Sequence, residues 1–388
     1  MKSLPLFPVT VVGSWPRPVW LLDAVRKLRD AKITEDEFRE LANSAVLLAV
    51  KYQEDAGIDL LTDGEQRRDN FYSFVVDKID GMKLVTVADL MDHIKDRAKF
   101  EQILRGLDVP AFSIRNPVAV GKVAKKRPLV LDDYFFIRDH TTKPVKVTLP
   151  GPYILSRAAW VEPLSYLNYR LRDDLALEII QILNEEIKAL RDAGVQFIQL
   201  DEPTLTEVVH GQVSAETFMC AALLSRRDPE EELELATFMI NETVRGISGV
   251  KLGLHICRGN WSRREDVLLK GGYEPLIPHL MEMNVDQLVL EFATPRAGDL
   301  SAFKEHPNKK ELGLGVVNQR TEEIESPEKI VEKAKEATKY FDPDKIYLNP
   351  DCGFGTFSEV PMATSTVAFE KLQSIVKAAN ILRKEFGG

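Results

Sequence analysis

The feature that most constrains the fold of this chain is a regular alternation of short apolar runs with longer segments of helical periodicity. Eight runs of four to six residues are rich in valine, leucine and isoleucine. Several are continuously apolar, which is typical of parallel strands covered on both faces. The eight runs are residues 8–13, 58–62, 145–149, 196–200, 250–255, 287–291, 312–317 and 346–349.

The segments between these runs have the spacing of amphipathic helices. In residues 173–193, apolar positions recur at Leu175, Ile179 and Leu183, and Gly194 provides a helix end before the next strand. Further helices are predicted over residues 35–57, 326–340 and 367–386. Eight strand–helix units with short turns favour an α/β fold of the closed (β/α)8 type, the TIM barrel. The alternative is an open doubly wound sheet, although no GxGxxG or GxxxxGKS/T phosphate-binding loop supports it.

The length of 388 residues suits one such domain over residues 1–388, because barrels of about 250 residues often carry insertions. Residues 70–142 are too many for a single connection, so we expect them to form an inserted excursion on the barrel rim between strands two and three. A helical piece is predicted over 97–107 and β-rich pieces over 117–123 and 128–137. A lid and an oligomer contact are both open roles for this segment.

Charge and cysteine content narrow the partners and the compartment. The net charge of −9 argues against nucleic acid or an anionic membrane as the main partner. No apolar run reaches the roughly 18 residues of a membrane helix, and four prolines interrupt the first 18 residues, so we expect a cytoplasmic protein without a signal peptide. Three cysteines do not suggest a disulfide framework. Cys220, in an apolar helical stretch, is predicted to be a core thiol.

Polar side chains follow nearly every predicted strand. The active sites of TIM barrels lie at the carboxyl ends of the strands, so these residues are expected to face one another. Polar loops are common, but that does not explain why two of three cysteines and one of six histidines fall at these positions. The strand-end residues are Ser14, Asp63, Glu65, Asp201, Glu202, His255, Cys257, Glu291, Asn318, Asp351 and Cys352.

Four of these residues have the chemistry of a zinc site. His255 and Cys257 are two positions apart and share a face of an extended strand end, while Glu291 and Cys352 follow two other strands. This spacing is too wide for a zinc finger but suits ligands gathered from three strands of a barrel. One imidazole, two thiolates and one carboxylate suit tetrahedral Zn²⁺.

The predicted charge of this site indicates its reaction. With three anionic ligands the centre has a formal charge of about −1, which makes it a poor source of hydroxide and a good host for a thiolate. A free thiol has a pKa of about 8.5, and coordination to zinc deprotonates it at neutral pH. We therefore expect a substrate sulfur to attack an electrophilic carbon, which is alkyl transfer.

Together the motifs resemble the catalytic C-terminal half of cobalamin-independent methionine synthase. The likeness runs in order from residue 10 to about residue 356. It rests on residues 10–16 (TVVGSWP), 63–65 (DGE), 151–155 (GPYIL), 198–203 (IQLDEP), 255–257 (HIC), Glu291, 315–318 (GVVN) and 349–353 (NPDCG).

The resemblance implies roles for individual residues. His255, Cys257, Glu291 and Cys352 match the family's zinc ligands. Ser14, Glu65 and Asp201 match positions that hold the amino and carboxylate groups of homocysteine, and Glu207 matches a further carboxylate on the substrate side. Glu65, Asp201 and Asn318 are the expected catalytic residues. The substrate assignment has an independent reason, because an ammonium group suits Glu65 and Asp201.

Three departures from the family pattern fall on the side of the methyl donor. We expect no counterpart of the family's N-terminal barrel, Ala158 replaces a pterin-stacking tryptophan with Trp160 two positions on, and Arg320 replaces a histidine linked to protonation. The expected donor is therefore a methylcorrinoid, either free methylcobalamin or a corrinoid protein, or else 5-methyltetrahydrofolate. The expected product is methionine.

Three other functions remain open on the sequence alone. Related single barrels open epoxides with coenzyme M, although its sulfonate would be repelled by Glu65 and Asp201. Barrels of similar layout decarboxylate uroporphyrinogen without a metal. A purely structural zinc site is the third alternative.

Overall fold

The fold is built on a parallel β-sheet. The computed structural model describes residues 4–86, 89, 115–211, 228–260, 262–307, 309–355 and 362–387. Six strands lie side by side in chain order, each parallel to the next. They are β3 (Lys146–Pro150), β4 (Phe197–Asp201), β5 (Lys251–Ile256), β6 (Gln287–Leu290), β7 (Glu311–Val317) and β8 (Ile346–Pro350).

Three parallel bridges join the two edges of this sheet. Val9 pairs with Leu348 of β8, Thr10 pairs with Leu60, and Leu61 pairs with Val145 beside β3. The sheet thereby closes into a barrel. The segments 8–13 and 58–62, which were predicted to be strands, take part in it only through these isolated bridges. One reason is that the Asp59 carboxylate accepts a hydrogen bond from the Val9 amide at 2.8 Å in place of a ladder partner. The prediction of an α/β fold with a parallel sheet is confirmed.

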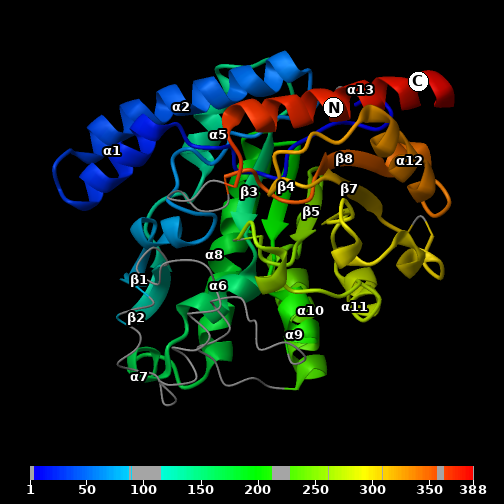
Figure 1. Cartoon of the computed structure of the whole chain (residues 1–388). Coiled ribbons are helices and arrows are strands. Elements are labelled where there is room, and N and C mark those ends of the chain that lie inside the picture. Colours follow the sequence, from blue (N-terminus) through cyan, green and yellow to red (C-terminus); the bar gives the residue numbers. More distant parts are fainter. Residues whose placement is uncertain are drawn as a thin grey trace.

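Helices cover the outside of the sheet, and the predicted long helices are present. They are α2 (Glu35–Ala56), α8 (Arg172–Asp192), α12 (Pro327–Ala337) and α13 (Ser365–Phe386). Thr34 and Glu37 form a capping box at the start of α2, and Gly57 ends it with φ +88°. Figure 1 shows α2 and α13 side by side, where they pack on each other.

Shorter elements connect these parts. The remaining helices are α1 (Val19–Arg29), α5 (Leu131–Arg138), α6 (Pro152–Ala159), α7 (Glu162–Ser165), α9 (Leu205–His210), α10 (Pro229–Thr243) and α11 (Ile277–Glu282). The 3-10 helices are Ser73–Asp77, Glu265–Val267, Pro295–Ala297, Leu300–Phe303 and Pro343–Lys345. Among the described residues, no helix combines the length and the apolar character that crossing a membrane requires.

The segment 70–142 contains a separate antiparallel pair, β1 (Ile79–Thr86) and β2 (Arg115–Lys125). The pair packs against α6, α7 and α8 and confirms the β-rich piece predicted over 117–123. The β-rich prediction over 128–137 is wrong, because α5 occupies most of it. The Glu186 carboxylate of α8 accepts hydrogen bonds from the Val130 and Leu131 amides at 2.8 and 3.1 Å, which fixes the start of α5. The predicted helix over 97–107 and Cys220 lie outside the described residues, and an insertion in this segment stays a prediction.

Candidate active site

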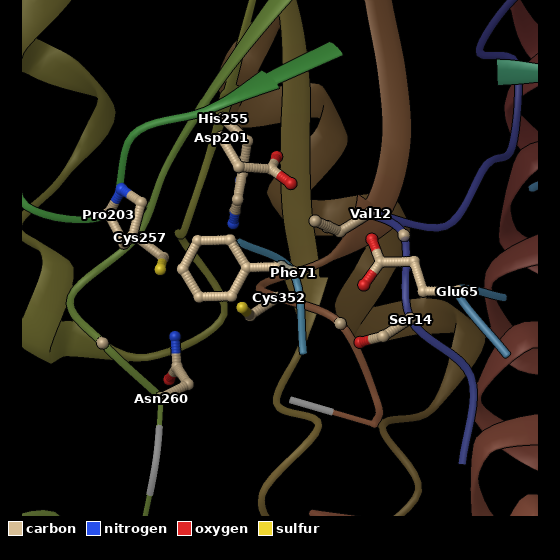
Figure 2. Close-up of a pocket in the computed structure, with 13 residues that line it drawn as sticks. Val12, Ser14, Glu65, Phe71, Asp201, Pro203, His255, Cys257, Asn260 and Cys352 are labelled. Carbon is tan, nitrogen blue, oxygen red and sulfur yellow. The ribbon is translucent and has the colours of Figure 1, made fainter. Parts of the chain in front are cut away.

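A cavity opens at the carboxyl ends of the barrel strands, which we call the mouth of the barrel. Its volume is about 510 Å³, including space open to solvent. Figure 2 shows its labelled side chains, with the sulfur atoms and the imidazole projecting into the same space. The cavity is lined by Val12, Gly13, Ser14, Glu65, Phe71, Asp201, Pro203, His255, Cys257, Gly259, Asn260, Cys352 and Gly353.

Three of the four predicted metal ligands converge in this cavity. The ligand atoms of His255, Cys257 and Cys352 all lie within 4.8 Å of one another. Nδ1 of His255 donates a hydrogen bond to the Val289 carbonyl at 3.0 Å, which leaves the buried Nε2 as the ring nitrogen available to a metal. A carbonyl acceptor on one ring nitrogen is the usual way to orient a histidine that binds a metal through the other. The donor set therefore fits Zn²⁺.

The electrostatics of the cluster also fit a cation. A hydrogen bond from Cys352 lowers the pKa of Cys257 to about 5, with His255 acting in the same direction against burial. The same hydrogen bond between Cys352 and Cys257 raises the pKa of the Cys352 thiol well above its ordinary value. Burial lowers the pKa of His255, but Cys257, Asp201 and Glu291 outweigh it and raise that pKa to about 9. Without a metal the cluster holds protons that a bound cation would displace.

Glu291 follows β6 directly, but its carboxylate lies outside this three-residue cluster. It is fully buried and accepts hydrogen bonds from Asn260 and from Nη1 of Arg258, the latter at 3.0 Å. Arg296 lies 3.6 Å from the same oxygen. Burial raises the pKa of Glu291, yet the two arginines outweigh it and hold that pKa below its usual value. Its role as a fourth ligand stays a prediction.

Arg258 and Asn260 were missed from the sequence. They follow the His–x–Cys pair directly, and this placement was the only available signal. Arg258 also donates to the Gly271 and Ala297 carbonyls and stacks 4.2 Å from the centre of the Tyr273 ring. The guanidinium is thus fixed on several sides, and its contact with Glu291 is part of a buried network.

Two carboxylates share the cavity with the thiol cluster, and one of them, Asp201, lies beside His255 on the neighbouring strand. Asp201 ends β4 and accepts a hydrogen bond from Nε2 of Gln199 at 2.7 Å. Burial, with Glu65 in support, raises the pKa of Asp201 to about 7 against the opposing effect of His255. Glu65 accepts a hydrogen bond from the Thr148 hydroxyl at 2.9 Å and has φ +55°, a strained value for a residue with a side chain.

Glycines make room for the polar groups of the cavity. A Cβ on Gly13 would lie 2.3 Å from Oε1 of Glu65, and one on Gly353 would lie 2.1 Å from the Ser14 hydroxyl oxygen. The Gly355 amide donates to that hydroxyl oxygen at 3.3 Å, and the Phe354 amide donates to the Ser14 carbonyl at 2.9 Å. Ser14 is therefore tied to the loop after β8, which carries Cys352.

Besides Glu291, two predicted site residues do not line the cavity, and their roles stay predictions. Asn318 follows β7 and uses its side-chain oxygen to accept the Arg320 amide at 3.1 Å, which shapes a turn. Glu207 is buried in α9. Arg320 pairs with Glu265 at 2.6 Å, and Trp160 packs edge-on against Tyr166 with ring centres 5.4 Å apart. Neither Arg320 nor Trp160 lines the cavity.

Two further carboxyl groups do not line the cavity but accept hydrogen bonds from backbone amides around the mouth. Glu202 accepts hydrogen bonds from the Tyr153 and Ile154 amides at 2.7 and 2.9 Å, which caps α6. Asp351 accepts the Phe292 and Ala293 amides, both at 2.9 Å. It thereby joins the loop after β8 to the loop after β6. Strand-end position alone did not separate these structural carboxyls from Asp201 and Glu65.

The fold and the site define an α/β barrel protein with a His–Cys–Cys cluster at its mouth that could hold a metal ion. Residues 7–381 match the family described as "Cobalamin-independent synthase, Catalytic domain". The methionine synthase of Sulfurisphaera tokodaii is 30% identical over 386 residues, which cover 99% of this chain and 95% of that protein. The methionine synthase of Pyrococcus abyssi is 32% identical over 385 residues, with the same coverage. The chain belongs to the cobalamin-independent methionine synthase family, an enzyme family of methyltransferases, which confirms the resemblance.

Solved structures support the same fold. The structure of a B12-independent methionine synthase from Shewanella sp. W3-18-1, in complex with selenomethionine, superposes with a TM-score of 0.73 at 25% identity and covers 98% of this chain and 99% of that one. A putative vitamin-B12-independent methionine synthase from Listeria monocytogenes gives 0.69 at 22% identity, with the same coverage. At that identity the Listeria protein shows the fold alone.

Proposed function

We propose that this chain acts in the cytoplasm as a zinc-dependent methyltransferase that transfers a methyl group to the thiol of homocysteine and forms methionine. One observation carries the proposal. The thiol and imidazole cluster of His255, Cys257 and Cys352 shares a cavity with the carboxylates of Asp201 and Glu65. The same cavity thus offers ligands that suit a sulfur-binding metal and acceptors that suit an ammonium group. The names of the relatives, and the selenomethionine in the Shewanella structure, support a sulfur amino acid.

His255, Cys257 and Cys352 would hold the zinc ion, with Glu291 as the proposed fourth ligand. When bound, Zn²⁺ lowers the pKa of a coordinating substrate thiol and leaves its sulfur nucleophilic. Asp201 and Glu65 accept hydrogen bonds from the substrate ammonium group, which are strong because both partners are charged. The Ser14 hydroxyl donates to the substrate carboxylate. Phe71 borders the cavity with an apolar ring and limits the water beside the sulfur.

The overall step is a displacement at the methyl carbon. The substrate thiol loses its proton, and a sulfur electron pair forms the new S–CH₃ bond. The bond between the methyl group and the donor breaks, and its electron pair stays with the donor. We favour a methylcorrinoid over 5-methyltetrahydrofolate as donor, because Trp160 packs on Tyr166 and does not supply an aromatic face in the cavity.

The test compares donors and thiols on the purified protein. About one zinc per chain and methionine formation from homocysteine are expected, with methylcobalamin and methyltetrahydrofolate assayed side by side. Calorimetry on the zinc protein should show binding of homocysteine and little binding of coenzyme M, whose sulfonate faces the two carboxylates. Full methionine formation by a metal-stripped Cys352→Ser variant would contradict the proposal.

A further inference from the structure

A buried lysine lies below the cavity, inside the barrel. Lys146 begins β3 and is 1% exposed. Its Nζ donates to the Val11 carbonyl and to Oε1 of Gln199, the latter at 2.9 Å. Gln199 lies on β4, two positions before Asp201. Its Nε2 donates to the Asp201 carboxylate at 2.7 Å and to the Val12 carbonyl at 3.0 Å.

The lysine determines which end of the glutamine amide faces Asp201. Burial lowers the pKa of Lys146 to about 7, yet even the neutral amine has two N–H donors, and these serve the Val11 carbonyl and the amide oxygen of Gln199. The amide oxygen of Gln199 therefore points to Lys146. The amide NH₂ must then point to Asp201 and Val12, where both partners are acceptors. If Lys146 were removed, a flipped amide would no longer be excluded, and a flipped amide would present an oxygen to the carboxylate.

Glu65 is supported by a second arrangement of the same kind. Nη1 of the buried Arg68 donates to the Thr148 hydroxyl at 3.0 Å, and that hydroxyl donates to Oε1 of Glu65 at 2.9 Å. Arg68 has only donors, so the single hydroxyl proton of Thr148 is directed to Glu65. The distance from Nη1 of Arg68 to Oε1 of Glu65 is 3.9 Å, which is too long for a direct hydrogen bond.

Both carboxylates are thus held by a buried basic residue, Lys146 or Arg68, acting through a neutral side chain. A basic group in direct contact would occupy carboxylate oxygens and compete with a bound ammonium group. With Gln199 between them, the charged form of Lys146 still favours the ionised Asp201 carboxylate through the low-dielectric interior. The carboxylate keeps accepting capacity toward the cavity, because an ionised carboxylate has about four acceptor sites.

We propose that Lys146, acting through Gln199, is a positioning residue that makes the site selective for thiols that carry an ammonium group. Arg68, acting through Thr148, is a second positioning residue, and it orients the hydroxyl group that donates to Glu65. The inference rests on the proposed function, in which Asp201 and Glu65 bind the ammonium group of homocysteine. It adds two buried residues that do not line the cavity but orient the groups that do.

The test uses Lys146→Met in the zinc-loaded protein and two thiols that differ only in the amino group. These thiols are homocysteine and 4-mercaptobutyrate. The variant should raise the KM for homocysteine about 10-fold, the expected cost of misplacing one hydrogen bond to a charged group, with kcat changed less than about threefold. Binding of 4-mercaptobutyrate, measured by calorimetry, should stay within about twofold of wild type. Lys251→Met at the opposite end of the barrel is the matched control and should change neither thiol.

Further variants keep the test independent of how Lys146→Met folds. Gln199→Met cuts the same connection, so the double variant should be no worse than either single one. Thr148→Val removes the connection from Arg68 to Glu65 and should raise the KM for homocysteine about threefold. Zinc content and thermal unfolding verify that each variant is intact. If Lys146→Met misfolds, the Gln199 and Thr148 variants carry the test.

The outcomes separate this inference from the proposed function. Equal weakening of both thiols, or no change for homocysteine, in intact variants would overturn the positioning role. A wild-type protein that does not distinguish homocysteine from 4-mercaptobutyrate would instead overturn the proposed function. A wild type that prefers homocysteine, with variants that keep this preference, would overturn only the role of Lys146 and Arg68.

Discussion

The charged side chains at the two ends of the barrel have different kinds of partner. At the opposite end from the mouth, which we call the base, cations contact acids directly: Lys251 pairs with Glu311 and with the Tyr347 hydroxyl, and Arg383 pairs with Asp59 at 2.6 Å. At the mouth, Asp201 and Glu65 are held through neutral side chains, and the imidazole of His255 lies beside the two thiols. Glu291 is the exception there, because Arg258 contacts it directly. The acids of these base pairs are thus occupied by cations, whereas Asp201 and Glu65 keep accepting capacity toward the cavity.

Cavity size does not account for this difference. The cavity at the base is about 660 Å³ and exceeds the one at the mouth, yet its lining is mainly Leu, Pro, Phe and Tyr, together with Gln196, Asp344 and the paired Lys251. The site is defined by side chains with unused bonding capacity, which are what a ligand recognises. Substitutions at the mouth should therefore affect activity and stability more than substitutions at the base.

The largest effect is expected from Cys352→Ser at the mouth. Removing one of three converging ligands should abolish stable zinc binding and reduce methionine formation by more than about 100-fold, beyond the loss seen when only an outer partner of a ligand is removed. Metal analysis and a methyl-transfer assay measure both. Cys220→Ser makes the same change at the third cysteine and should retain zinc. A Cys352→Ser protein with full zinc would refute the metal centre.

Arg258→Met should cause the largest loss of stability. Glu291 and Arg258 are both fully buried, and removing the arginine leaves a buried carboxylate with less compensation, at a cost of about 3 kcal/mol. Urea unfolding at a fixed zinc concentration measures the change in free energy of unfolding. The double variant Arg258→Met with Glu291→Gln should recover part of the loss. Absence of any recovery would mean that the pair is not coupled.

Asp201→Asn should change substrate binding more than stability. The amide keeps the shape but loses the charge that attracts an ammonium group, so the KM for homocysteine should rise at least about 10-fold. Steady-state kinetics and calorimetry with homocysteine measure this effect, and 4-mercaptobutyrate serves as the control thiol. An unchanged KM for homocysteine would remove Asp201 from the substrate site.

The smallest effect is expected at the base. Lys251→Met breaks a pair whose side chains are 23% and 22% exposed, so the free energy of unfolding should fall by only about 1 kcal/mol. Activity and zinc content should stay at wild-type values. A change in the KM for homocysteine would show that the base is coupled to the mouth, and the contrast between the two ends would fail.

Much of the fold was predictable because its signals are local. The helices over 173–193 and 367–386 follow from apolar spacing, and their observed ends differ by no more than two residues. Residues 128–137 gave the wrong prediction because their apolar content suits a strand, while Glu186, 50 or more positions away, fixes the start of a helix there. The local residue pattern over 128–137 does not depend on a side chain so far away in the sequence, so this contact could not be predicted.

The site was predictable only in part. His255, Cys257 and Cys352 were found because rare residue types at strand ends carry a strong signal. Asn318 and Glu207 have the expected residue types but do not line the cavity, and their roles stay predictions.

The amino-acid sequence by itself determined the alternation of strands and helices, the residue types at the strand ends and the family. These properties depend on backbone periodicity and on the chemistry of single side chains, both of which are readable in order along the chain. Only the tertiary structure decided that Glu291 faces two arginines and that Gln199 connects Lys146 to Asp201. The folded barrel brings Lys146 to Gln199, 53 positions away, and Arg258 to Glu291, 33 positions away, and hydrogen-bond geometry then selects one partner among many of the same chemical type.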